Sequence, residues 1–132
     1  MTQALPDAPS HRFEGTPFGP LLLDRDCIFY YDEPLLYLGQ AADGTVWLCE
    51  LLDTDDRSRR DETMAIELTS EEAAFWRSRS ARLDLVEPLS RLFEGERTRW
   101  IVVETWDEDA VVRIAECRPA TPAEVADAAP RR

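Results

Sequence analysis

Residues 35–52 read LLYLGQAADGTVWLCELL, and this stretch contains the clearest structural pattern of the chain. Apolar and aromatic side chains dominate both of its ends, as is typical of strands. The middle has turn chemistry, because Asp43 can hydrogen-bond the local backbone and Gly44 can adopt a positive φ. The stretch therefore predicts a β-hairpin, in which two antiparallel strands are joined by a short turn.

Further strands are predicted on both sides of this hairpin. The β-branched and aromatic runs that indicate them cover residues 27–31, 63–68, 98–106 and 110–116. Residues 53–60 are rich in charge and predict a solvated loop, and residues 107–109 predict the turn between the last two strands.

Three capping patterns predict helices. Each places a cap residue three positions before a glutamate: Thr69 with Glu72, Asp84 with Glu87, and Thr121 with Glu124. We expect a helix over residues 70–79, a second that starts near residue 84, and a short terminal helix with a proline at its first position. The order of strands, helices and strands predicts an α+β fold, with a mainly antiparallel sheet of about five to six strands and two or three short helices on one face.

Proline-rich, weakly apolar ends frame the expected domain. Residues 1–17 are predicted to form a flexible N-terminal segment, and residues 18–117 a single α+β domain. Residues 118–132 are predicted to form a C-terminal tail that contains the possible short helix.

The chain is strongly acidic, with 27 acids, 15 bases and a net charge of −12. Phosphate contacts need clustered positive charge, so direct binding to nucleic acid or to an anionic membrane is not expected. The charge leaves open a basic protein partner or imitation of nucleic acid. Every base is an arginine, and lysine and asparagine are both absent, which indicates a GC-rich bacterial genome.

The cysteines, Cys27, Cys49 and Cys117, are odd in number and widely spaced, which predicts neither a disulfide framework nor a zinc site. The first twenty residues lack the basic start and apolar run of a signal peptide. The apolar stretches are also too short to span a bilayer. A cytoplasmic protein is therefore expected.

Several motifs follow one another in an order that resembles a known family. YDEPLL at residues 31–36 precedes an Asp-Gly turn, DLVEPL at residues 84–89 and TPAE at residues 121–124. The chain resembles, over residues 28–126, a family of small bacterial domains of unknown function that begins with Tyr-Asp-x-Pro-Leu-Leu. The resemblance implies a bacterial domain, and it implies no catalytic residue.

No complete catalytic or metal-binding motif is present. His11 is the only histidine and lies in the N-terminal segment, which is unsuited to an oriented base. Asp53, Asp55 and Asp56 are read as a solvated cluster rather than a cation site, because the pattern lacks the residues of an EF-hand. We expect no metal and no cofactor.

Three glutamates in or beside predicted strands could take part in acid–base chemistry if two of them met in a cleft. They are Glu33, Glu50 and Glu104. The simpler expectation is that each points to solvent from a half-buried sheet.

Two tryptophans are the candidate anchors of an interface. Trp76 adjoins Phe75 on a short helix, where only one of the two rings can point fully inward, and Trp106 lies at a hairpin tip. The predicted partner-binding residues are Trp76, Trp106, Asp107, Glu108 and Asp109.

These observations favour a non-enzymatic protein-interaction or regulatory module of a bacterial cell, including a role in conflict systems such as phage defence. An acidic nucleic-acid mimic that inhibits a DNA- or RNA-binding protein is the first alternative, although arginines interrupt its acidic pattern. A small carboxylate-based enzyme is the second alternative, and a deep pocket with two convergent carboxylates would support it.

Overall fold

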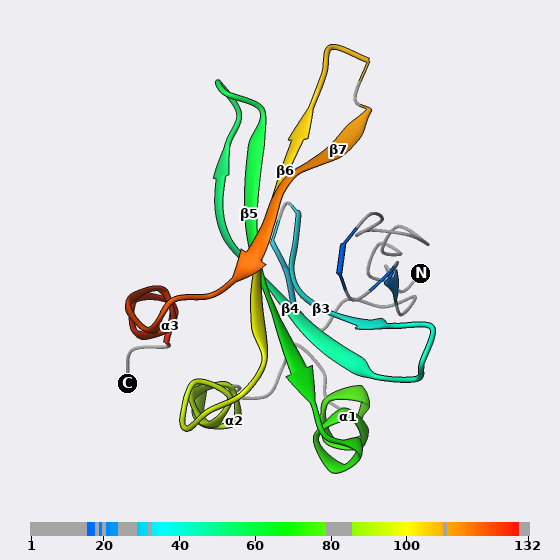
Figure 1. Cartoon of the computed structure of the whole chain (residues 1–132), viewed down its shortest axis with the longest axis vertical. Coiled ribbons are helices and arrows are strands. Elements are labelled where there is room, and N and C mark those ends of the chain that lie inside the picture. The colour runs from blue at the N-terminus through cyan, green and yellow to red at the C-terminus, as the bar shows by residue number, and fades with distance from the viewer. Residues whose placement is uncertain are drawn as a thin grey trace, which may run out of the picture.

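The computed structural model describes residues 16–17, 19, 21–23, 29–31, 33–78, 86–109 and 111–129. The strands are β1 (Leu22–Leu23), β2 (Phe29–Tyr31), β3 (Glu33–Gln40), β4 (Val46–Asp55), β5 (Arg60–Leu68), β6 (Arg99–Trp106) and β7 (Val112–Pro119). The helices are α1 (Ser70–Arg77), α2 (Val86–Arg91) and α3 (Pro122–Ala128). The predicted α+β class is confirmed, with the sheet dominating three short helices (Figure 1).

All strands join one antiparallel sheet in the order β1-β3-β4-β5-β6-β7, and β2 pairs with β3 beside this path. Among the residues that the structure describes, the sheet has seven strands, because β1 and β2, both very short, add to the five long ones. The predicted strand over residues 27–31 is confirmed only for Phe29–Tyr31, since Cys27 lies outside the described residues.

The hairpin over residues 35–52 is confirmed as β3 and β4. Leu36 pairs with Glu50, and Gln40 pairs with Val46 next to the turn. The turn has the expected chemistry, because Gly44 has a φ of +91° and the Asp43 carboxylate accepts a hydrogen bond from the Thr45 amide at 2.9 Å.

The prediction of a loop over residues 53–60 is wrong. β4 continues to Asp55 and β5 begins at Arg60, so only a four-residue turn separates them. The Asp55 carboxylate accepts hydrogen bonds from the amides of Arg57 and Ser58, which stabilises the turn. Asp55 faces Arg60 across the strands, and the Thr54 hydroxyl donates a hydrogen bond to the Asp61 carboxylate opposite it, so this charged sequence is paired as strands although it is exposed.

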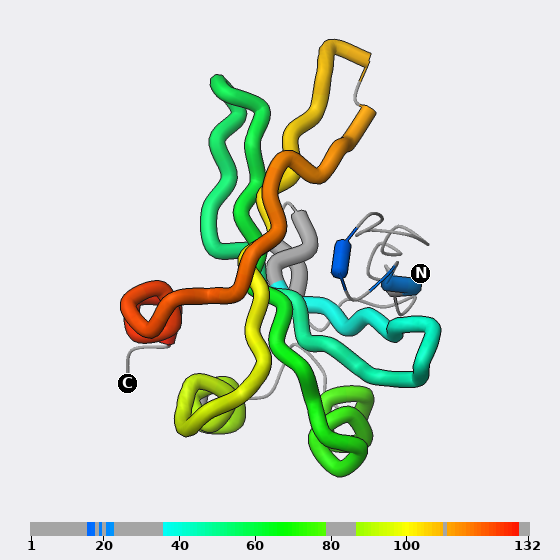
Figure 2. Tube along the Cα trace, in the orientation of Figure 1, coloured from blue at the N-terminus to red at the C-terminus, as the bar shows by residue number. Residues whose placement is uncertain are grey.

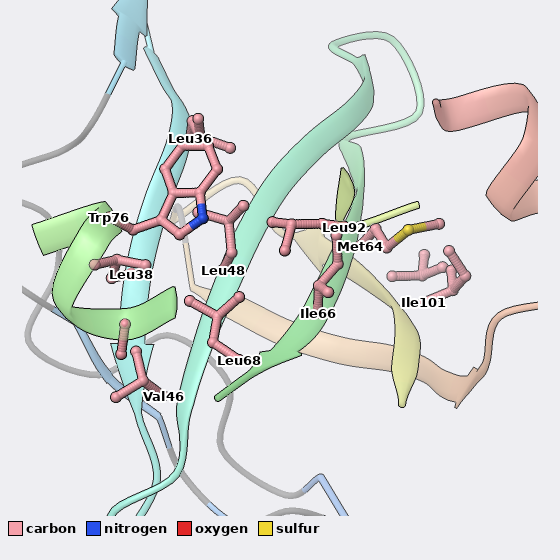
Figure 3. Packing of buried hydrophobic residues seen from close by; sticks show 12 residues of the cluster. Leu36, Leu38, Val46, Leu48, Met64, Ile66, Leu68, Trp76, Leu92 and Ile101 are labelled. Carbon is pink, nitrogen blue, oxygen red and sulfur yellow. The ribbon is translucent and has the colours of Figure 1, made fainter. Parts of the chain in front are cut away.

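The sheet is buried on both faces, because alternate residues enter two separate clusters. The cluster under the helices contains Leu38, Leu48 and Ile66, with Trp76 of α1 packed over them (Figure 3). Side chains from α2 and α3 pack against this same cluster, so all three helices cover one face. The opposite face carries a second cluster around Tyr37, which also includes Leu21.

Arginines hold the helices to the sheet. Arg97 forms two hydrogen bonds to the Glu72 carboxylate, at 2.6 and 2.9 Å, and Glu72 completes the capping box of α1 with Thr69. The Arg97 guanidinium keeps the pKa of Glu72 below its usual range. The buried Arg99 donates to the Leu92 carbonyl oxygen just after α2, at 2.7 and 3.1 Å. This bond satisfies a carbonyl that the helix itself leaves open.

The predicted terminal helix and its capping box are confirmed in α3. The Thr121 hydroxyl accepts a hydrogen bond from the Glu124 amide, and Arg118 donates two bonds to the Glu124 carboxylate at 2.5 and 2.6 Å. Val125 and Ala128 pack against the cluster under the helices. Residue 117, where the domain is expected to end, lies inside β7, and the division into domain and tail stays a prediction. The second predicted helix is described as α2 from Val86 onward, and Asp84, its expected cap, lies outside the described residues.

Candidate functional site

The predicted anchor Trp106 lies at the end of β6, where the β6–β7 hairpin projects away from α1 and α2 (Figure 2). It pairs directly across the strands with Val112. Ile114 lies two residues further along β7 and therefore on the same face as Val112. Val111 adjoins Val112 at the turn, just before β7 begins, and alternation does not place it on that face. We call Trp106, Val111, Val112 and Ile114 the hairpin surface.

The hairpin surface continues the second cluster into solvent. Ile114 is half-buried against that cluster, whereas Val111 and Val112 nearer the tip are 48% and 55% exposed. Trp106 is half-buried. The apolar face of the sheet thus extends beyond the part that the core covers. Signals for this surface were present in the sequence, because the two valines and Ile114 follow Trp106 across a predicted turn.

The three predicted acids lie in the turn between β6 and β7, and they have different roles. The Asp107 carboxylate accepts hydrogen bonds from the amides of Asp109 and Val111, at 2.9 and 3.0 Å, so it shapes the turn. Glu108 and Asp109 are exposed. The hairpin surface therefore ends in negative charge.

The prediction that Trp76 is an exposed anchor is wrong. Trp76 is 2% exposed and belongs to the core cluster under the helices. Its neighbour Phe75 is half-buried and meets the indole edge-to-face, with ring centroids 5.6 Å apart. One ring points inward, as expected, but it is the larger ring, since burying more apolar area is more favourable.

A groove of about 420 Å³ lies between α1 and α2. Its apolar lining consists of Phe75, Trp76, Pro88 and Leu92. Its polar lining consists of Glu71, Glu72, Glu87 and Arg91. Within this lining Arg91 lies 3.5 Å from the Glu87 carboxylate, in an exposed pair.

A second pocket, of about 290 Å³, lies between α3 and the β4–β5 hairpin. Four carboxylates line it, from Asp53, Glu62, Glu124 and Asp127. The hydrogen bonds from Arg118 lower the pKa of Glu124 to about 2, so this group stays ionised and is unsuited to act as an acid near neutral pH.

The expectation that the strand glutamates point to solvent is wrong for Glu50 and Glu104. Glu104 is 1% exposed, and Glu50 is half-buried with its Oε2 atom enclosed. On β5, Glu50 pairs with Met64 and Glu104 pairs with Asp61. Met64 and Asp61 are three residues apart, an odd number, so they point to opposite faces of the sheet. The two glutamates therefore also lie on opposite faces. The two carboxylates therefore cannot converge. The side chain of Glu33 lies outside the described residues.

Glu50 lies on the face of the sheet that the helices cover, and its neighbours across the strands are apolar. It lies between Leu36 and Met64, both members of the cluster under the helices. Burial raises its pKa from 4.5 to about 7, and its Oε2 atom has no hydrogen-bond partner among the described residues. Alternation along β4 could have revealed this position, since Leu48, Glu50 and Leu52 occur at every second residue.

Neither a metal site nor a reactive thiol emerges from the residues that the structure describes. No group of three or more Asp, Glu, Cys or His side chains there could hold a metal ion. Cys49 is buried and therefore closed to reagents in solution. For Cys117, burial raises the pKa of the thiol, which makes the reactive thiolate less available. His11 lies outside the described residues.

Comparison with known protein families, with curated proteins and with solved structures finds no match to this chain. The resemblance to a small bacterial domain family therefore stays a prediction. Within the described part of the chain, no helix has the length and apolar character needed to cross a membrane.

Proposed function

We propose that this protein is a non-enzymatic interaction module that binds a protein partner through the hairpin surface. The observation that carries the proposal is the exposure of Val111 and Val112 beside the half-buried Trp106, on a hairpin that projects beyond the helices. Exposed apolar residues that adjoin an aromatic side chain and carry a polar rim are typical of protein interfaces.

The acids of the hairpin turn support a partner with basic residues. Glu108 and Asp109 are exposed at the edge of the apolar area, and the chain as a whole carries a net charge of −12. Such a charge speeds the encounter with a basic protein and selects against acidic ones.

The edge of β7 itself is less suited to binding by strand addition. The pairing of β6 with β7 is irregular between Val103 and Glu104, and β7 ends at Pro119. Bulges and edge prolines protect a sheet from pairing with another chain. We therefore assign the contact to the side chains of the hairpin surface rather than to the backbone edge.

A tagged pull-down from bacterial lysate, with mass spectrometry, tests the proposal. The variant Val111→Ser/Val112→Ser removes the exposed apolar area, and Leu22→Ser is the control, because Leu22 is 52% exposed on a distant strand. We expect a stoichiometric protein that survives moderate salt, is retained by Leu22→Ser and is lost with the double variant.

Two other outcomes would count against this proposal. Equal capture by the double variant and the control would show that the hairpin surface is not the contact. Capture of DNA-binding proteins alone, released by salt and by competing DNA, would favour the nucleic-acid mimic instead.

A further inference from the structure

We infer that the groove between α1 and α2 binds a short amphipathic helix of a basic partner, with a bulky apolar side chain inserted beside Phe75 and flanking arginines or lysines paired with the acidic rim. This inference goes beyond the proposed function, because the groove lies on the face of the sheet that the helices cover, whereas Trp106, Val112 and Ile114 of the hairpin surface lie on the other face.

The floor of the groove can accept an apolar side chain. Trp76 and Leu92 are almost fully buried beneath it, whereas Phe75 and Pro88 remain half-buried at its sides. The volume of about 420 Å³ falls within the range of roughly 300–1,000 Å³ typical of ligand sites.

The charged residues at the rim of the groove lie about one helical turn away from other residues that line it. Glu71 precedes Phe75 by four residues on α1, and Glu87 precedes Arg91 by four residues on α2, so each pair lies along one side of its helix. A partner helix that inserts one apolar side chain would place its own residues one turn away over these charges.

The rim keeps a net charge of −1 after its internal pairs are counted, because three acids face two arginines. Arg97 neutralises Glu72 through two hydrogen bonds, and Arg91 faces Glu87 at 3.5 Å. Glu71 has no ion pair or hydrogen bond with any described residue, so its charge is available to a cation. The complementary occupant is therefore an apolar residue with basic neighbours, which matches the helix-in-groove mode of recognition.

Fluorescence anisotropy with the whole chain and a labelled peptide tests this inference. The peptide is an amphipathic helix of about fifteen residues, with leucines along one face and arginines beside them. Two matched peptides replace the leucines with serine or the arginines with glutamate. We expect saturable binding of the first peptide and at least tenfold weaker binding of both others, as an order of magnitude.

Two variants with the same change of charge locate the site. Glu71→Arg should weaken binding about tenfold, whereas Asp56→Arg, at an exposed acid in the β4–β5 turn outside both proposed surfaces, should change it less than about twofold. Circular dichroism checks that both variants are folded, and amide NMR shifts on peptide addition should centre on Phe75 and Leu92.

The inference is overturned if the leucine peptide does not bind, if the serine peptide binds equally well, or if both charge variants weaken binding to the same extent. The last result would mean that net charge alone attracts the peptide. None of these results bears on the hairpin surface, whose test uses different variants.

Discussion

At the residue scale, the least expected feature is a carboxyl group within the apolar face that carries the helices. Glu50 lies between Leu36 and Met64, where a charged group loses the stabilisation of water. Burial therefore raises its pKa to about 7, and the protein holds this proton over a pH range in which an exposed glutamate has lost it.

This pKa shift predicts that stability falls as pH rises. The folded protein binds the proton more tightly than the unfolded chain, whose glutamate titrates near 4.5, so the folded state is disfavoured increasingly from pH 4.5 to about 7. Glu50→Gln removes the charge. In urea unfolding at about pH 8, we expect the free energy of unfolding of the variant to be higher than that of the wild type by up to roughly 2 kcal/mol. At about pH 5 we expect the two free energies of unfolding to differ little.

Glu108→Gln is the control for this experiment, because Glu108 is exposed in the hairpin turn. Its free energy of unfolding should follow that of the wild type at both pH values. A difference between Glu50→Gln and the wild type that did not depend on pH would contradict the assignment of the proton to Glu50.

At the element scale, the helices are too short to be stable alone, and their attachment to the sheet depends on arginine contacts. Each helix accepts hydrogen bonds from one arginine: α1 from Arg97, the end of α2 from Arg99, and α3 from Arg118. In a chain without lysine, these contacts use the planar guanidinium group, which can donate several hydrogen bonds at once.

Removing the hydrogen bonds between Arg99 and the end of α2 should lower the free energy of unfolding substantially. Arg99 is 8% exposed and satisfies the Leu92 carbonyl oxygen with two hydrogen bonds. Arg99→Met keeps much of the side-chain volume but leaves that oxygen without these donors, so we expect a loss of about 2–3 kcal/mol in the free energy of unfolding. Arg91→Met is the matched control on an exposed pair, and it should cost less than about 1 kcal/mol.

The contact at α3 should affect that helix more than the rest of the domain. Glu124→Ala removes both the bonds from Arg118 and one half of the capping box. We expect faster hydrogen exchange at Val125 and at the following amides, a stability loss of about 1 kcal/mol, and little change in the strands.

Asp127→Ala is the comparison for Glu124→Ala, since Asp127 lies on the same helix, is exposed and has no hydrogen bond or ion pair with a described residue. It should leave the exchange of α3 nearly unchanged. Equal rates of amide hydrogen exchange in α3 of the two variants would show that the Arg118–Glu124 pair does not stabilise this helix.

At the scale of the whole molecule, the two faces of the sheet have different surroundings. The helices cover one face and leave an acid-rimmed groove between α1 and α2. On the other face, the apolar residues of the second cluster continue along the β6–β7 hairpin through Ile114 to Val112, which is exposed to solvent. The proposed contacts therefore use separate surfaces, and variants in one are expected to leave the other intact.

Local patterns in the sequence predicted much of this architecture. The β3–β4 hairpin and the capping boxes of α1 and α3 depend on residues a few positions apart, so the chain itself carries the information. The composition of residues 53–60 predicts a loop, whereas the structure continues the strands there, because the cross-strand pairing of Asp55 with Arg60 is not visible from composition.

Strand, turn and capping patterns are enough to predict the antiparallel α+β class and the turn at Gly44, and the composition gives the net charge. Only the tertiary structure decided that Trp76 is buried while Phe75 lines a groove, and that Glu50 and Glu104 lie on opposite faces. The physical reason is that turns and caps form between near neighbours in the chain. Burial depends on which distant surfaces meet, and therefore on the packing of the whole domain.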